Sequence, residues 1–469
     1  MAPSVIIEEA EDSALEEYDH FEEVRKPSPH STRQRNEDDL DAAESELLDE
    51  DVDDGVEGLD ELAAPAPDEN PDEERTEYHR SLEEERETSN RRSATREHTQ
   101  QAIKRPPLQQ RLLTQLYTHS WLVFFSIFGT LARLGVKWIT NYRNGPVTTN
   151  VLWANFGGSL ILGFLQEDRA LFAEKRGRHL LSNSHSSSSS GDDNDEKKQR
   201  NAQADQISRK KYIPLYVGLA VGFCGSFTSY SSFMRDLFLG LSDELIGKGQ
   251  VKLARSAGWS AASVLGVIIT EVTVSLSALS FGAHLAIALL PLLSSIPQTN
   301  TAKFTNPLGV FLGIGCWFGG ICLAIWPPHD AWRGQLVFAI VFAPLGTIVR
   351  YWLSITLNRR IKSFPIGTFT ANMLGTAFLA MAYDLQHANL QGNVVGGSII
   401  GCQVLQGITE GFCGCLTTVS TWVAELRSLR KKHAYLYGVT SISIGLSLMV
   451  VIMGALQWTS ELRPPTCKV

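Results

Sequence analysis

Two short stretches of this 469-residue sequence combine residues that could handle an ion. GFCGSFTSYSSF occupies 222–233 and GFCGCLTTVSTW occupies 411–422, and each places hydroxyl groups after two glycines inside apolar sequence. Residues three or four apart share a helix face, so Thr417, Ser420 and Thr421 could form a polar track. The other hydroxyl and aromatic candidates are Thr228, Ser229, Ser231, Ser232, Thr418, Tyr230, Phe233 and Trp422.

The two glycines of each stretch predict a broken helix. Each glycine weakens a helix by about 1 kcal/mol relative to alanine. In a membrane, the backbone groups freed by a break must be satisfied by protein, water or an ion. Freed carbonyl oxygens favour a small cation, so the duplicated break predicts a coordination site on the axis between the two copies. The alternative, in which the hydroxyls only form hydrogen bonds within or between helices, is disfavoured by the duplication.

Matched polar residues interrupt the apolar sequence elsewhere. Asn155 and Asn372 lie at the starts of matched spans, where a hydrogen bond between helices is the alternative to a role in ion passage. Arg133 and Arg350 lie one turn past matched glycines. An arginine near a span end either marks a pathway or extends to the lipid headgroups.

The last apolar segment and the cysteines complete the candidates. Tyr437, Ser441 and Gly445 are spaced by four residues and therefore share one helix face. The seven cysteines include no CxxC pair and no histidine at metal-ligand spacing. Six of them fall in apolar segments, so we expect packing residues and predict neither a disulfide nor a metal site from them.

Composition predicts the elements that position these residues. The net charge of -9 averages two dissimilar parts. Residues 1–110 are acidic and nearly free of aromatic residues, which predicts a disordered tail, and the lack of a signal-peptide pattern predicts that it stays in the cytosol. From Ser120 onward there are nine apolar stretches of about 20 residues, the length that crosses a bilayer. They lie near 120–141, 148–166, 212–239, 257–288, 307–326, 335–357, 366–386, 397–426 and 433–458.

The apolar region contains an internal repeat. GTLAR at 129–133 matches GTIVR 217 positions later, whereas the GFCG stretches are 189 apart. The first copy therefore has 28 additional residues, which we place in a Ser-rich loop at 168–211. Each copy has four spans, so the lone stretch 307–326 would invert the second copy. The predicted fold is an all-α polytopic membrane protein with two antiparallel four-helix repeats, 119–290 and 334–460, joined by a ninth transmembrane helix at 305–328.

The positions of lysine and arginine agree with this orientation in part. The stretch 169–211 and the cluster from Arg427 to Lys432 would lie inside, and the predicted outer loop after Asp384 has no basic residue. The loop from Arg235 to Arg255, however, carries four positive charges and would lie outside.

Three motifs occur in the same order in both copies: GxxxR, an asparagine before a glycine-rich span, and a GFCG core followed by hydroxyl residues, which reads GFCGxxTSxSS in the first copy and GFCGxxTTxST in the second. Over about residues 120–458 the sequence thereby resembles the CrcB/Fluc fluoride channels, and the fused double copy resembles the eukaryotic fluoride export proteins called FEX. The resemblance implies a passive fluoride-selective channel that exports fluoride from the cytosol across the plasma membrane and gives fluoride resistance. It also implies that one chain, an internal pseudo-dimer, works as a monomer in the lipid bilayer.

The resemblance assigns roles to the candidate residues. It implies a structural sodium ion held by the backbone carbonyls of Gly225, Thr228, Gly414 and Thr417. Neutral hydroxyl and amide donors and aromatic ring edges suit fluoride, because they replace its water at moderate strength. A buried lysine or arginine would bind the ion too tightly for release. The implied fluoride pathway comprises Asn155, Asn372, Tyr230, Phe233, Thr228, Ser231, Thr418, Ser420, Thr421, Trp422, Tyr437 and Ser441, with Arg133 and Arg350 towards the vestibule.

The two copies depart from the family pattern in different ways. Tyr230 and Phe233 occupy the two phenylalanine positions of the family in the first copy, whereas the second has Val419 and Trp422. Valine has no aromatic edge. Glu271 stands in the first copy where the second has Tyr437. We therefore expect the two paths to conduct unequally.

Two other functions compete with the channel. A coupled secondary transporter with inverted repeats needs a titratable group in the membrane, for which Glu271 and Glu410 are candidates. Neither carboxylate recurs in the other copy. A non-conducting scaffold would use the acidic tail to recruit partners. The sequence has no P-loop, nucleophile arrangement or metal-ligand cluster, so we predict no enzyme activity, and we expect no nucleic-acid partner.

Overall fold

The computed structural model describes most of the chain from Leu108 onward. The acidic tail, for which the sequence predicts disorder and a cytosolic position, and nearly all of the Ser-rich loop, which is predicted to lie inside, are outside the described residues. The described residues are 108–145, 147–172, 210, 212–247, 249–250, 256–294, 302–327, 333–361, 363–390, 394–460 and 463–467.

Nearly all of the regular secondary structure in the described part of the chain is helical, as the sequence predicts. A short antiparallel ribbon, in which Asn389 pairs with Val395, is the exception. The first half contains α3 (Leu108–Thr140), α4 (Leu152–Glu167), α7 (Pro214–Val217), η3 (Gly218–Cys224), α8 (Gly225–Phe227), α9 (Tyr230–Leu241), α10 (Ala257–Ala288), α11 (Leu290–Ser294) and α12 (Ala302–Ile325). The second half contains η4 (Arg333–Val337), α14 (Phe338–Leu357), η5 (Asn358–Arg360), α15 (Ile366–His387), β1 (Asn389–Leu390), β2 (Val394–Val395), α16 (Ile399–Gly407), η7 (Ile408–Cys413), α17 (Gly414–Leu416), α18 (Ser420–Ser428) and α19 (Lys431–Ser460).

Six helical segments in the described part of the chain are long and apolar enough to cross a membrane. The other three predicted spans are also helical, but α4 has only 16 residues, the segment from α7 to α9 is broken, and α15 is not among the six. The all-helical membrane class is thus confirmed, while the count of nine spans stays a prediction. The six segments are 109–140, 258–288, 304–325, 338–360, 399–428 and 431–459.

Long apolar side chains cover the outer surfaces of these helices. On α12, Phe304, Phe311 and Phe318 are all exposed and recur at intervals of seven, which places them on one face. Water would not favour such a surface, whereas lipid chains would. The exposed apolar residues therefore agree with helices that contact a bilayer.

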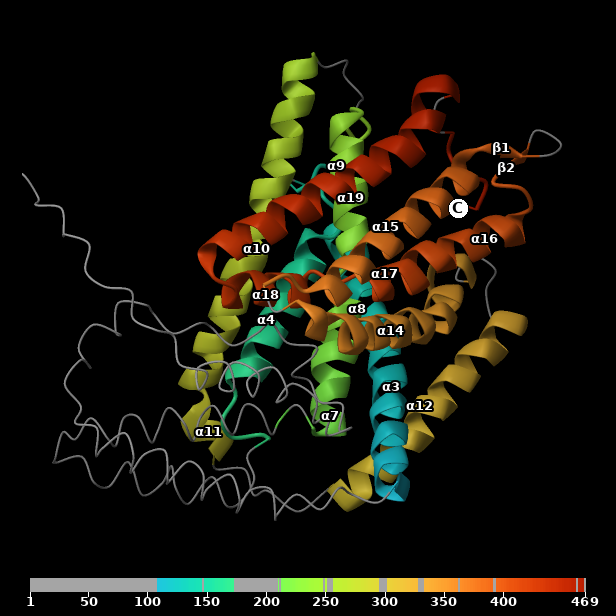
Figure 1. Ribbon diagram of the computed structural model, residues 1–469. Helices are drawn as coiled ribbons and strands as arrows, with labels where there is room; N and C mark the ends of the chain where they lie inside the picture. The colour runs from blue at the N-terminus through green and yellow to red at the C-terminus, as the bar shows by residue number, and fades with distance from the viewer. Residues whose placement is uncertain are drawn as a thin grey trace, which may run out of the picture. The chain divides into compact units, whose positions relative to one another are not determined.

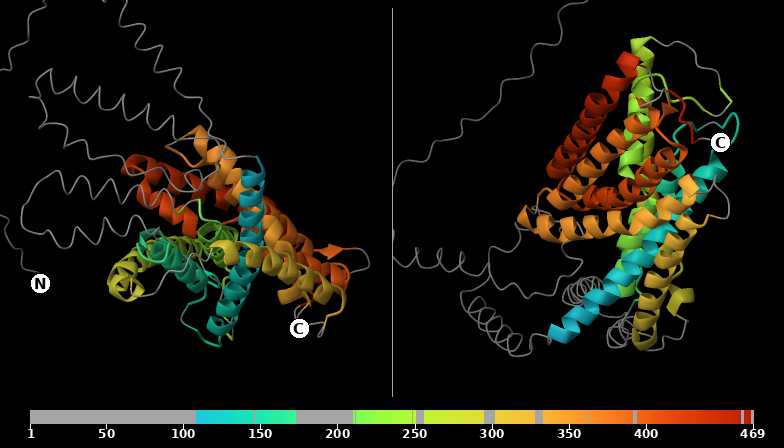
Figure 2. Two further views of the ribbon diagram at one scale, coloured as in Figure 1. Left: turned by 90° about the horizontal axis from the view of Figure 1, so that it is seen from below. Right: turned by 90° about the vertical axis from the view of Figure 1, so that its right-hand side faces the viewer.

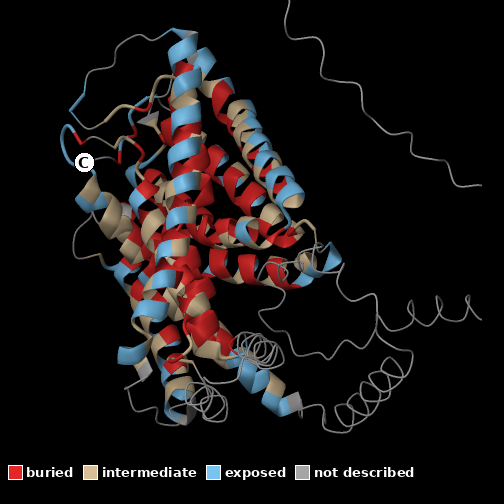
Figure 3. Ribbon diagram, turned by 90° about the vertical axis from the view of Figure 1, so that its left-hand side faces the viewer, coloured by how far each residue is buried: buried red, intermediate tan, exposed pale blue. Residues whose placement is uncertain are grey.

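Two sets of helices cross in the middle of the described region (Figure 1). The first set includes α3 and α10, which run up the picture, and the second includes α14 and α19, which run across it. Figure 2 shows the same crossing from two further directions. Buried residues concentrate where the sets meet, in the short helices α8 and α17 and the starts of α9 and α18 (Figure 3). The crossing brings together the two GFCG stretches.

Candidate functional site

The two GFCG stretches break their helices at equivalent threonines. Thr228 follows α8 in an extended conformation (φ -91°, ψ 157°), and Thr417 follows α17 in nearly the same one (φ -97°, ψ 155°). A π-helical turn, η3 or η7, precedes each short helix. The prediction of broken helices is confirmed. Its location was wrong by a few residues, because Gly225 and Gly414 themselves are helical.

The glycines of the two GxxxR motifs allow close packing against the broken helices. A Cβ on Gly129 of α3 would lie 2.5 Å from the backbone oxygen of Phe223. Its counterpart Gly346 of α14 lies against the oxygen of Phe412 in the same way. The glycines of both GxxxR motifs therefore seat α3 and α14 directly on the backbones of the π-helical turns.

The matched asparagines hold the backbone at the breaks. Asn155 accepts a hydrogen bond from the amide of Ser229 at 2.9 Å, and Asn372 accepts one from the amide of Thr418 at 2.9 Å. A break leaves such amides without helical partners, and a buried unpaired amide is costly. Both asparagines are buried, so each one satisfies a break from a neighbouring helix. The hydrogen bond between helices, which the sequence offered as the alternative to a role in ion passage, is therefore present for both asparagines.

The hydroxyl groups form a cluster that joins the two copies. Thr228 Oγ1 lies 3.1 Å from Ser420 Oγ, and Thr417 Oγ1 lies 3.0 Å from Ser231 Oγ, which is the equivalent pair with the copies exchanged. Thr418 Oγ1 lies 3.2 Å from Thr228 Oγ1. All five residues are buried. The structure thus brings the predicted hydroxyl track together. Thr421 lies half-buried at the edge of the track and accepts a hydrogen bond from the Thr418 hydroxyl at 3.4 Å.

Aromatic rings lie beside this cluster. Tyr230, Phe233 and Trp422 are fully or almost fully buried. Tyr230 meets Trp422 edge to face with centroids 5.4 Å apart, and it meets Phe233 in the same manner at 5.8 Å. The Tyr230 hydroxyl and the Trp422 indole N–H have no hydrogen-bond partner in the described part of the chain. Val419 is buried and supplies no ring edge at its position.

The last helix contributes Tyr437, whose partner was not predicted. Its hydroxyl donates to the carboxylate of Glu425 at 2.7 Å, and Thr368 donates to the same carboxylate at 2.5 Å. Ser441 is buried but donates to the carbonyl of Tyr437 in its own helix at 2.7 Å. A Cβ on Gly445 would lie 3.4 Å from the Tyr230 ring. The face formed by Tyr437, Ser441 and Gly445 therefore points towards α9.

The corresponding region of the first copy is packed more closely. Asn155 donates to the carboxylate of Glu271 on α10 at 3.0 Å. A Cβ on Gly163 of α4 would overlap the backbone oxygen of Leu279, and one on Gly282 of α10 would overlap that of Leu160. Helices α4 and α10 therefore touch backbone to backbone. This side of the molecule carries a buried carboxylate and little room beside it.

The matched arginines lie at the breaks and not at an open mouth. Arg133 has 0% and Arg350 has 2% of its surface exposed. Arg133 donates to the carbonyl of Gly414 at 2.8 Å, although the two residues belong to different copies. Arg350 correspondingly donates to the carbonyl of Val221 in the first copy at 2.9 Å. Both arginines are therefore buried between the copies, and their vestibule role stays a prediction.

A cleft of about 940 Å³ opens one turn beyond Arg133. Lys137 binds the Glu410 carboxylate in it at 2.6 Å, and Arg235 binds Asp236 at 2.9 Å. Arg235 lies within α9 and is buried, so one of the four charges assigned to an outer loop belongs to this cleft instead. The cleft therefore places paired cations near the ends of α3 and α9.

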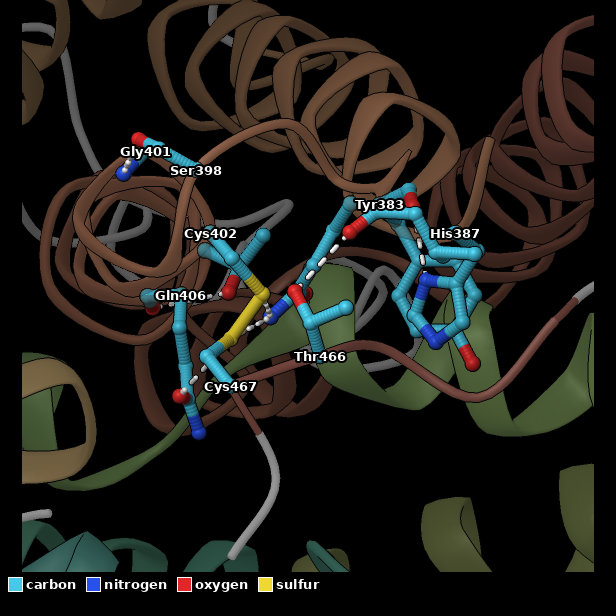
Figure 4. The surroundings of a disulfide bond; sticks show 11 residues. Tyr383, His387, Ser398, Gly401, Cys402, Gln406, Thr466 and Cys467 are labelled. Atoms are coloured by element: carbon cyan, nitrogen blue, oxygen red, sulfur yellow. Dashed lines mark hydrogen bonds between the residues drawn. A yellow bond between two sulfur atoms is a disulfide. The ribbon is translucent and has the colours of Figure 1, made fainter. Parts of the chain in front are cut away.

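A disulfide bond lies at the same end of the molecule. Cys402 of α16 is bonded to Cys467, 65 residues later (Figure 4). Next to it, Thr466 donates to the carbonyl of Val395 in β2 at 2.9 Å. The expectation that the cysteines form no disulfide was wrong for this pair. The bond holds the segment whose Arg463 lines the cleft.

Sequence reasoning overlooked two pairs of residues that the repeat itself could have indicated. Asp236 and Glu425 are 189 positions apart, the spacing of the GFCG stretches, and both are fully buried. Ser159 and Thr376 are 217 apart and follow the two asparagines by one turn. Their hydroxyls are buried and have no partner among the described residues. Aligning every polar residue of the two copies would have found all four.

Comparison with known proteins identifies the family. The model of the family described as CrcB-like protein, Camphor Resistance (CrcB), matches residues 120–283 and 337–455. The chain belongs to the CrcB-like family. The two matched stretches of this CrcB-like chain contain both breaks and all of the predicted site residues.

Several named proteins resemble this CrcB-like chain. Fluoride export protein 1 of Neurospora crassa is 50% identical over 372 residues, covering 76% of this chain and 70% of that protein. Fluoride export protein 1 of Candida albicans is 32% identical over 345 residues, covering 72% and 79%. Fluoride-specific ion channel FluC of Acinetobacter baylyi is 32% identical over 123 residues, covering 25% of this chain and 90% of that protein. No solved structure matches the chain.

Proposed function

We propose that this protein is a passive, fluoride-selective channel that lets fluoride leave the cytosol and so gives fluoride resistance. The observation that carries the proposal is the 50% identity, over 76% of the chain, to a protein named for fluoride export. The match to the bacterial fluoride-specific channel, which covers 90% of that shorter protein, supports a channel over a pump.

The chemistry of the crossing supports passage of a small, strongly hydrated anion. Such an ion gives up water only where protein donors replace it, and neutral donors replace water without holding the ion too tightly. The hydroxyl of Tyr230 and those of Ser159 and Thr376 are buried donors without partners in the described part of the chain. The ring edges of Tyr230 and Phe233 add partial positive charge.

The second half offers the better path. Asn372, Thr376 and Tyr230 lie on α15 and α9, which contact one another and α19. The corresponding space between α4 and α10 is filled by backbone contacts, and Glu271 places a carboxylate there. We therefore propose that fluoride passes mainly along α9, α15 and α19, with Tyr437 at one end.

The proposed architecture is two antiparallel four-helix repeats joined by a ninth transmembrane helix, acting as a monomer in the plasma membrane with a cytosolic N-terminal tail. The family match in two stretches on either side of α12 supports this arrangement. Disulfides persist in oxidising surroundings, so the bond at Cys467 supports an external C-terminus. Arg427 lies where α18 ends and Lys431 lies where α19 begins. These basic residues are therefore at the end of α19 away from the C-terminal segment, as expected for a cytosolic loop.

A flux assay in proteoliposomes tests the function. Liposomes loaded with fluoride and made permeable to potassium should release fluoride much faster than similar liposomes release chloride. Fluoride flux should respond to membrane voltage and ignore an imposed proton gradient, whereas a coupled transporter with Glu271 or Glu410 as its titratable group would respond to the proton gradient. Chloride release as fast as fluoride release would refute selectivity.

A further inference from the structure

A guanidinium lies inside the contact between the two copies. Arg133 extends from α3 and is completely buried. Its Nη1 donates to the carbonyls of Ser226 at 2.6 Å and Gly414 at 2.8 Å, and its Nη2 donates to that of Glu410. A single side chain therefore binds backbone oxygens of both copies at once.

These acceptors belong to the ends of the broken helices. Carbonyls in the last turn of a helix have no amide partner further along the chain and carry partial negative charge. Ser226 lies in α8 and Gly414 in α17, each just before a break. Two helix ends thus direct carbonyl oxygens at the same place, which is the arrangement expected for a buried cation. The guanidinium is that cation.

Gly414 is required for this approach. A Cβ at this position would lie 2.6 Å from Arg133 Cζ, which no side chain could accommodate without moving the arginine. The equivalent Gly225 faces Arg350 in the same way. The glycine at the end of each GFCG motif therefore admits the arginine of the other copy.

The two arginines are not equally bound. Arg350 donates to one carbonyl, that of Val221, and its Nη1 and Nε have no partner within the described residues. Arg133 binds several carbonyls through both of its terminal nitrogens. Of the two, Arg133 is the one that joins the breaks.

Two of these oxygens are among the four that the family resemblance gives to sodium. Of the four carbonyls, Gly414 and Thr228 accept from Arg133 Nη1 at 2.8 Å and 3.4 Å. Carbonyl oxygens are suitable ligands for sodium. A sodium ion bound to both of these oxygens would, however, share them with the positively charged guanidinium nitrogen. Like charges at such short range in a buried site repel strongly. The arrangement therefore does not suit a guanidinium and a sodium ion together.

We propose that the guanidinium of Arg133 takes the place of a structural sodium ion in this protein and holds the two helix breaks together. The proposal concerns the folded structure and does not depend on which ion the protein transports. Two consequences follow. The protein should be stable without sodium, and loss of the guanidinium should expose a set of carbonyls that sodium can use.

Thermal unfolding of the full-length protein in detergent tests the first consequence. We expect the same Tm in sodium chloride and in N-methylglucamine chloride of equal ionic strength. We also expect equilibrium dialysis with radioactive sodium to show no bound ion. A saturable rise in Tm with sodium, or one bound sodium ion per chain, would overturn the proposal without any variant having to fold.

Removal of the guanidinium tests the second consequence. Arg133→Ala should lower the Tm in N-methylglucamine chloride and regain part of the loss as sodium is added. Ligand binding at 100 times its Kd stabilises by about 2.7 kcal/mol, so the regain should be about 5 °C. Arg133→Lys retains a cation at the site and should stay independent of sodium.

Arg350→Ala is the matched control, because it removes the equivalent arginine and leaves Arg133 in place. Its Tm should not depend on sodium. If Arg350→Ala gained the same sodium dependence as Arg133→Ala, the special role of Arg133 would be wrong. If neither variant folds, the sodium independence of the unmodified protein still decides the question.

Discussion

The Asn155 amide donates to the Glu271 carboxylate at 3.0 Å, whereas its counterpart Asn372 donates to the backbone carbonyl of Thr418 at 3.2 Å. The two asparagines are equivalent in the repeat and each accepts from a freed amide at a break. They differ in what their donor group faces. In the first copy the partner is an acidic side chain, whereas in the second copy it is a backbone carbonyl.

We therefore expect Asn372→Ala to reduce fluoride flux at least about tenfold more than Asn155→Ala does. Removal of one donor worth about 1.4 kcal/mol at a barrier slows passage by a factor of ten. Flux should be measured in proteoliposomes at equal protein content, with Tm as the control for folding. If each variant retained half of the unmodified flux, the two paths would be equivalent and the expectation wrong.

The aromatic positions should show the same inequality. Tyr230→Ala or Phe233→Ala removes a buried ring next to the hydroxyl cluster, so export should fall about tenfold or more. Val419→Ala, at the equivalent of Tyr230, removes no ring edge and should have a much smaller effect on export. Fluoride tolerance of cells that carry each variant is a convenient readout. An equal loss from Val419→Ala would contradict this prediction.

Tyr437 and Thr368 should act as a unit through Glu425. Each donates to the same buried carboxylate, at 2.7 Å and 2.5 Å. Tyr437→Phe or Thr368→Val should each destabilise the protein by about 1–3 kcal/mol, because the buried carboxyl group of Glu425 loses one of two donors. The double variant should deviate from the sum of the single effects. Additive changes in Tm would show that the two hydroxyls do not share the carboxylate.

The Cys402–Cys467 bond should stabilise the end of the molecule that carries the cleft. Closing a loop of 65 residues restricts the unfolded chain by about 4 kcal/mol in the entropic account. The Tm should therefore fall by the same amount in Cys402→Ser, in Cys467→Ser and in the double variant. A reducing agent should lower the Tm of the unmodified protein by a similar amount. Cys316→Ser, which removes a free cysteine, is the control and should have little effect. Larger destabilisation in the double variant would indicate separate packing roles.

The 169–211 loop of the first copy and the C-terminus of the chain should lie on opposite sides of the membrane. An epitope tag in the 169–211 loop should be reached by antibody only after cells are permeabilised, whereas a tag after Val469 should be reached in intact cells. The disulfide at Cys467 gives the physical reason, because it requires oxidising surroundings. Accessibility of both tags under the same conditions would require a different number of spans.

The sequence alone predicted the class of protein and the chemistry of its centre. Long apolar segments indicate membrane helices whatever their partners, because the bilayer requires each helix to satisfy its own backbone. Duplicated motifs indicated that the hydroxyls after the two GFCG cores belong together, and the structure does place Thr228 against Ser420. These features are visible in the sequence because they depend on local spacing and on comparison of one copy with the other.

The tertiary structure decided which atoms meet. The two breaks lie at Thr228 and Thr417, a few residues after the glycines. The glycines stay helical and let neighbouring groups approach closely, which helix propensity alone does not reveal. Arg133 crosses to the other copy to reach Gly414, 281 residues away, and Cys402 pairs with Cys467. Contacts between residues so distant in the chain depend on how the helices pack and cross. The two copies are similar in sequence, but the fold gives their equivalent residues different partners. Arg133 therefore differs from Arg350, and Asn155 differs from Asn372, in what each side chain binds.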